Sequence, residues 1–99
     1  MVLDLLVDTG ATYTLLPADV VARLELPTPY ERRAMLASGQ PVTYRIGDVR
    51  IRLGEEEHTM VFLAGPAGSR ALLGAFTLEG FGLAADPVHH RLFPVPALV

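Results

Sequence analysis

The chain has 99 residues, which suits one small domain and is too short to build a deep two-lobed cleft on its own. It has no cysteine and its basic residues are all arginine, which excludes disulfides, thiol catalysis, Cys-based zinc sites and lysine chemistry. A net charge of −3 without a basic cluster argues against a nucleic-acid partner.

The apolar content is high for a chain of this length. Apolar residues make up 51% of the sequence, yet no apolar run approaches the roughly 20 residues that a membrane-spanning helix needs. We therefore expect no membrane partner, and we expect the excess apolar surface to lie in an oligomer interface. No basic stretch precedes the short apolar run at the N-terminus, so we predict no secretory signal and a cytoplasmic location.

The first part of the chain predicts short strands and one helix. Val2–Val7, which is apolar except for Asp4, predicts a buried strand, and residues 8–13 form a loop around Gly10. Extended structure resumes at Thr14–Leu16, and Pro17 then stands at a first-turn position of a short helix.

The middle of the chain predicts a hairpin and a further strand. Arg33–Leu36 and Pro41–Ile46 flank the sequence ASGQ, which is a hairpin signal because Gly39 is able to take a positive φ. Val49–Leu53 alternates strictly between apolar and arginine side chains, as a half-buried strand does. The sequence GEEEH, at 54–58, predicts a polar turn.

The last part of the chain predicts two more strands, one helical turn and a final hairpin. In chain order these are a strand at 59–65, a loop at 66–69, a strand leading into Gly74, a helical turn at 76–82 and a hairpin at 83–96 with its turn at Asp86-Pro87. Many short strands at this spacing favour an all-β protein with a small closed sheet and one or two short helices. No linker or repeat interrupts the chain, so residues 1–99 are predicted to form a single domain.

Asp8 is the residue that most needs an explanation. It stands between the apolar sequences LLV and TLLP at the end of a strand, where desolvating a carboxylate is costly. A turn that Asp8 caps would explain an isolated Asp-Thr-Gly, but a surface turn does not need apolar flanks. DTGATYT also resembles the phosphate loops of actin-like kinases and the phosphorylated aspartate of ion pumps. The first needs a larger two-domain frame, and the second has a lysine after the aspartate.

The chain resembles the retropepsin-like aspartic proteases in two blocks. LLVDTGATYTLLP, at Leu5–Pro17, is similar to the family's apolar sequence followed by Asp-Thr-Gly and Ala or Ser. ALLGAFTLEGFGL, at Ala71–Leu83, is similar to its two apolar residues and Gly before a short helix. The resemblance covers nearly all of the chain from Leu5 onward. It implies a small closed acid-protease barrel with a flap hairpin that works as a homodimer.

The resemblance implies an aspartic endopeptidase that needs no cofactor, metal or covalent intermediate. Asp8 of each subunit would meet across a two-fold axis, where two carboxylates share one proton because both cannot ionise cheaply. The ionised carboxylate takes a proton from a water that attacks the peptide carbonyl, and the protonated one donates to the carbonyl oxygen. The implied partners are a peptide or protein substrate and a second copy of the chain.

The resemblance also assigns roles to the residues after Asp8. Thr9 is expected to hydrogen-bond across the two-fold axis, and Gly10 to direct a backbone N–H at the carboxylates. Ala11 stands where many family members have Ser, whose hydroxyl stabilises the ionised carboxylate. Thr12 is expected either to contact the substrate backbone or to be a loop hydroxyl without that role.

Two further segments complete the implied site. Ser38 and Gly39 would form the tip of a flap that closes over the substrate, although ASGQ suits an ordinary hairpin turn almost equally well. Leu72, Leu73 and Gly74 would pack beneath the aspartate loop and support it, which is compatible with a plain core strand and turn.

The N-terminus departs from the family pattern, which usually has a further strand or hairpin before the aspartate strand. We expect either a truncated start or a C-terminal hairpin, in the extended tail after Leu83, that takes over its role. The apolar content of the end of this tail, at 91–99, favours a strand of a dimer sheet over a loose tail. Without either, the alternative is a retropepsin-fold binding or scaffolding module with weak or no activity. His89 and His90 would point opposite ways on a strand, so we expect no metal there. Apolar lining from Leu36, Val42 and Leu72 favours apolar substrate side chains.

Overall fold

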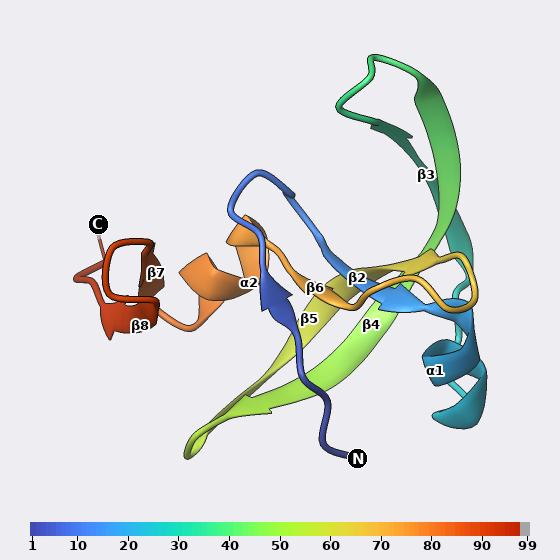
Figure 1. Cartoon of the computed structure of the whole chain (residues 1–99). Helices are drawn as coiled ribbons and strands as arrows, with labels where there is room; N and C mark the ends of the chain where they lie inside the picture. The colour runs from blue at the N-terminus through green and yellow to red at the C-terminus, as the bar shows by residue number, and fades with distance from the viewer. Residues whose placement is uncertain (98–99) are drawn as a thin grey trace.

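Strands dominate the computed structural model, which describes residues 1–97 (Figure 1). The helices are α1 (Ala18–Arg23) and α2 (Ala75–Gly80). The strands are β1 (Leu6–Val7), β2 (Thr14–Pro17), β3 (Tyr30–Met35), β4 (Pro41–Leu53), β5 (Glu56–Gly65), β6 (Leu72–Leu73), β7 (Leu83–Asp86) and β8 (Arg91–Pro94). The predicted mostly-β class with two short helices is confirmed, while closure of the sheet into a barrel stays a prediction.

Six strands form one sheet in the order β1-β6-β2-β5-β4-β3, and β7 pairs with β8 in a separate hairpin. Most neighbours run antiparallel, but β1 is parallel to β6 and β2 is parallel to β5. The parallel β1–β6 pair brings the loop after β1 beside the segment after β6, although the two are about 65 positions apart in sequence. Figure 1 shows the β7–β8 hairpin beyond α2, away from the large sheet.

The core lies between α1 and the middle of the large sheet. Leu16, Val21, Val49 and Phe62 are buried together, and Phe62 is fully enclosed. Along β4 the apolar Val49, Ile51 and Leu53 are more buried than the arginines between them, so the predicted alternation is confirmed. Burial of these side chains supplies the main driving force for the fold.

The prediction of a buried strand at Val2–Val7 is wrong in extent and in burial. Only Leu6–Val7 is a strand, and these side chains are 44% and 37% exposed. The physical reason is position, because β1 forms the outer edge of the sheet and has β6 as its only partner within residues 1–97. Its apolar side chains therefore remain at the surface.

The hairpin predicted around ASGQ is confirmed and is longer than expected. β3 pairs with β4 from Tyr30↔Ile46 to Met35↔Pro41, and Gly39 has a φ of +87° at the tip. β4 then continues through Gly47 into the predicted alternating strand as one element. Gly47 fits there because an added Cβ would lie 2.2 Å from the carbonyl oxygen of Pro27.

The predicted polar turn at 54–58 is wrong for its second half. The turn involves Gly54, which has a φ of +62°, and β5 begins at Glu56. Glu56, Glu57 and His58 pair with Leu53, Arg52 and Ile51 of β4. Backbone pairing to the long β4 strand therefore extends through a charged sequence that has weak strand propensity.

The predicted C-terminal elements are confirmed. α2 follows Gly74, and the last hairpin turns at Asp86-Pro87 as expected. Within the tail at 91–99, Arg91–Pro94 forms β8, and the last two residues lie outside the described part. The helices within residues 1–97 are too short and insufficiently apolar to cross a bilayer.

Candidate active site

Asp8 lies directly after β1, where the chain leaves the sheet edge and enters the loop at residues 8–13, called the aspartate loop below. Its backbone N–H donates to the carbonyl oxygen of Leu73 at 3.0 Å. The N–H of Ala11 donates to the carbonyl oxygen of Asp8 at 3.1 Å, which closes the turn. The Asp8 side chain is half-buried, so the carboxylate is held at the surface end of the strand.

The carboxylate of Asp8 is oriented by the backbone of its own loop. The N–H of Gly10 donates to Asp8 Oδ1 at 3.0 Å, and an added Cβ on Gly10 would lie 3.3 Å from that oxygen. Glycine therefore allows the loop backbone to approach the carboxylate closely. Thr9 and Thr12 are exposed, whereas Ala11 is half-buried.

The segment after β6 supports the aspartate loop. The N–H groups of Ala75 and Phe76, in the first turn of α2, donate to the carbonyl oxygens of Ala11 and Thr12 at 2.8 and 3.0 Å. The first N–H groups of a helix have no partner within the helix, so the loop satisfies two of them. Together with the Asp8–Leu73 bond, these contacts tie the two sequence blocks into one unit.

Gly74 and a buried threonine pair lie beneath the loop. The hydroxyls of Thr14 and Thr77 are 2.7 Å apart, and Thr14 Oγ1 accepts the N–H of Gly74 at 3.1 Å. Both threonines are essentially without solvent contact. The sequence-based reasoning missed both of them. The available signal was one threonine in each of two otherwise apolar stretches, TLLP and AFTL.

Removing the acceptor hydroxyl of this pair is expected to destabilise the fold. Thr14→Val removes Thr14 Oγ1, the hydrogen-bond partner of both the buried N–H of Gly74 and the Thr77 hydroxyl. We expect this loss to lower the free energy of unfolding by about 1–3 kcal/mol. Thr77→Val removes one hydroxyl and leaves the Gly74 bond in place, so we expect a smaller loss. Urea unfolding of both single variants and the double variant measures the coupling between them. Equal stability of Thr14→Val and the wild type would contradict the assignment.

The β3–β4 hairpin carries Ser38 and Gly39 at an exposed tip. In Figure 1 the tip projects toward the top of the view, on the same side as the aspartate loop. No hydrogen bond joins Ser38 or Gly39 to the aspartate loop among residues 1–97. The structure therefore places the predicted tip on a hairpin and does not bring it into contact with Asp8 within one chain.

One contact does join the hairpin to the aspartate loop. Arg32 of β3 donates from Nη1 to the hydroxyl of Tyr13, and its guanidinium carbon lies 5.6 Å from the centroid of the Tyr13 ring. The Tyr13 ring meets Phe76 of α2 edge-on, with centroids 6.3 Å apart. Neither Tyr13 nor Arg32 was singled out from the sequence, because nothing local indicates that they meet.

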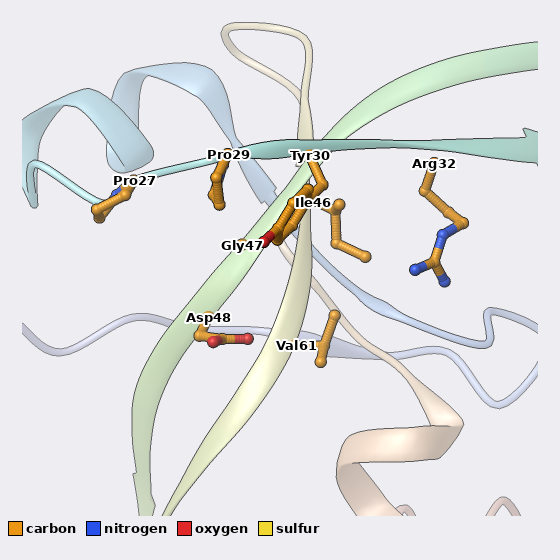
Figure 2. A pocket seen from close by; sticks show the side chains of 8 residues that line it. All are labelled: Pro27, Pro29, Tyr30, Arg32, Ile46, Gly47, Asp48 and Val61. Carbon is orange, nitrogen blue, oxygen red and sulfur yellow. The ribbon is translucent and has the colours of Figure 1, made fainter.

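Two hollows lie near the β3–β4 hairpin and the aspartate loop. One, of about 330 Å³, lies at the root of the β3–β4 hairpin, and Arg32, Ile46 and Val61 are among its lining residues (Figure 2). Another, of about 460 Å³, lies between β1 and the β7–β8 hairpin, and its lining includes Thr9 and His90. The second hollow adjoins the aspartate loop directly.

Two of the three histidines, His58 and His89, make local polar contacts. His89 Nδ1 lies 2.7 Å from Asp86 Oδ2, and this hydrogen bond, with backbone N–H groups of Val88 and His89, holds the pKa of Asp86 below its ordinary value of 3.8. His58 pairs with Glu56 at 2.7 Å. No group of three or more His, Cys, Asp or Glu side chains within residues 1–97 is placed to hold a metal ion.

Comparison with known proteins adds one finding. A family model described as "Aspartyl protease" matches residues 2–76, which include the aspartate loop, the β3–β4 hairpin and the segment through β6 to the start of α2. A search of curated proteins gave no significant match. The family match spans about three quarters of the chain, and it includes the whole of the first block and the second block as far as Phe76.

Proposed function

The chain belongs to the aspartyl protease family, and we propose that it is an endopeptidase in which two copies each contribute Asp8 to one active site. The observation that carries this proposal is the position of Asp8. Its carboxylate is aimed by the N–H of Gly10, in a loop that the segment at Leu73–Phe76 holds in place. A fixed, half-buried carboxylate at the end of a strand suits acid–base chemistry on a bound water.

The proposed reaction divides acid and base roles between two equivalent carboxylates. Two Asp8 side chains brought together share one proton, since two adjacent negative charges are costly. The ionised one removes a proton from water as the oxygen attacks the peptide carbonyl, and the other donates its proton to the carbonyl oxygen. Breakdown of the tetrahedral intermediate then returns a proton to the leaving amine, and no external reactant other than water is consumed.

Pairing of two copies is supported by the surface around β1. Leu6 and Val7 expose apolar side chains beside Thr9, whose hydroxyl has no hydrogen-bond partner within residues 1–97. We propose that this surface faces the second copy and that Thr9 hydrogen-bonds across the two-fold axis. Ser38 and Gly39 then cover the substrate as the tip of a flap, a motion that the exposed β3–β4 hairpin permits.

The alternative function is a binding or scaffolding module that keeps the fold without cleaving peptides. The short β1, with Met1–Leu5 outside any strand, favours it, because it offers little backbone for an intersubunit sheet. Sedimentation of the chain at micromolar concentration, combined with peptide cleavage over the same concentrations, separates the two. A dimer whose activity rises with its dimer fraction supports the peptidase, and a strict monomer without cleavage supports the module.

The alanine at position 11 is expected to influence the pH at which cleavage is fastest. A serine hydroxyl at this half-buried position would donate to the ionised carboxylate, and alanine cannot. We expect Ala11→Ser to move the acidic limb of the pH–rate profile toward lower pH, so that the wild type acts closer to neutrality. The measurement is kcat/KM against pH for both proteins on one peptide. A profile that does not move would contradict this role.

A further inference from the structure

The face of the β3–β4 hairpin that meets the aspartate loop carries one arginine. Side chains alternate along β3, and Arg32 lies opposite Tyr44 of β4 on the face that reaches Tyr13. Arg33, the next residue, lies on the other face of the same strand and is exposed. If the proposed function is correct, a peptide substrate runs between this hairpin face and the aspartate loop, and so passes the guanidinium of Arg32.

No carboxylate within the described residues, 1–97, pairs with the guanidinium of Arg32. Three other arginines form ion pairs within residues 1–97, which are Arg45–Glu31, Arg50–Glu57 and Arg91–Asp86. Arg32 has no such pair among residues 1–97, and its partner is the neutral hydroxyl and ring of Tyr13. A guanidinium offers five N–H donors in a planar fork and stays charged at any working pH. Most of its capacity to bind a carboxylate therefore remains unused.

The guanidinium of Arg32 contacts Tyr13 without any ligand, although Arg32 is exposed. Tyr13 meets Phe76 edge-on, and its hydroxyl and ring restrict the end of the Arg32 side chain. Such preorganisation lowers the entropy cost of binding a partner. Figure 2 shows Arg32 on one side of Ile46 and Val61, with the Asp48 carboxylate on the opposite side.

From these contacts we propose that Arg32 is a specificity-determining residue that selects an acidic side chain, Glu or Asp, at one position of the peptide substrate. The side chain's methylene groups would lie against the apolar wall that includes Ile46, and its carboxylate would meet the guanidinium. The acidic residue would stand a few positions from the cleaved bond, at the end of the hollow away from the Asp48 carboxylate (Figure 2). This inference rests on the proposed function, since it assumes that the substrate lies between hairpin and loop.

The test compares peptides that differ only by Glu or Gln at each position near the cleaved bond. For the wild type, we expect kcat/KM to be about fivefold higher for Glu at one position, as for a well-formed ion pair at a partly exposed site. Arg32→Gln is expected to bring that ratio to about one. Arg33→Gln removes the same charge from the opposite face and is the matched control, so its ratio should equal that of the wild type.

Binding to the Asp8→Asn variant separates this inference from the proposed function. If the wild type cleaves but Arg32→Gln keeps the full Glu preference, the inference is overturned and the peptidase stands. A second outcome is that no peptide is cleaved, yet Asp8→Asn binds the Glu peptide more tightly than the Gln peptide. If the double variant Asp8→Asn with Arg32→Gln lacks this difference, the peptidase proposal fails and the acidic site stands. Equal affinity for Glu and Gln peptides at every position, in cleavage and in binding, contradicts the inference outright.

Discussion

Asp8→Asn will abolish peptide cleavage while leaving the fold intact. Asparagine has nearly the same shape, and its amide oxygen is able to accept the Gly10 N–H in place of Asp8 Oδ1. It cannot take a proton from water or share one with a second carboxylate, so we expect kcat/KM to fall about a thousandfold or more. The measurement is cleavage of a peptide library by both proteins, with circular dichroism and thermal unfolding to compare their folds.

Asp4→Asn is the control for this result, because Asp4 is an exposed aspartate four positions earlier and carries the same charge. The activity of Asp4→Asn should equal that of the wild type within twofold, since a surface substitution away from the proposed active site changes little. Equal cleavage by Asp8→Asn and the wild type would remove Asp8 from the mechanism and would point to a contaminating peptidase.

Gly74→Ala will cause the largest loss of stability among small substitutions near the site. An added Cβ would lie 2.4 and 2.5 Å from the carbonyl carbon and oxygen of Tyr13 and 2.8 Å from the nitrogen of Thr14. All three are backbone atoms of the segment that leaves the aspartate loop, so they cannot move aside alone. We expect a loss of about 2–3 kcal/mol in the free energy of unfolding, measured with urea.

Gly80→Ala, at the other end of α2, is the matched control. There the added methyl would meet the end of the Met60 side chain, which is flexible and able to move. The expected loss is therefore smaller than for Gly74→Ala. Equal losses of stability in the two variants would contradict the claim that Gly74 is needed for close packing of the loop against β6 and α2. Any Gly74→Ala protein that folds should also lose activity, because Asp8 depends on the same unit for its position.

Local sequence carries much of the fold and part of the site. Two local signals were read correctly. The apolar sequence before Asp8 predicts a strand that ends there, and β1 does end at Val7. The glycine of ASGQ predicts a turn, and Gly39 has a positive φ. The second block around Gly74 was placed beneath the aspartate loop only through the family resemblance. In the structure, two N–H groups of α2 donate hydrogen bonds to carbonyl oxygens of the aspartate loop, and these bonds hold the second block beside the loop.

Contacts between distant segments were not predictable from the sequence. Thr14 and Thr77 are 63 positions apart, and an isolated threonine in a strand or helix has many roles besides a buried pair. Tyr13 and Arg32 meet because the fold brings β3 and the end of the aspartate loop within reach of each other, which no local pattern indicates. The burial of Val2–Val7 was overestimated because an apolar run does not reveal whether its strand is central or at the edge of the sheet.

Mixing wild-type chains with an excess of Asp8→Asn chains tests the central claim most directly. With about nine Asp8→Asn chains per wild-type chain, random pairing leaves only about a tenth of the wild-type chains in wild-type dimers. Activity per wild-type chain should then fall to about a tenth, since a mixed pair lacks one carboxylate. Activity per wild-type chain that stays constant at every ratio, after full exchange of subunits, would contradict a site built from two copies of Asp8.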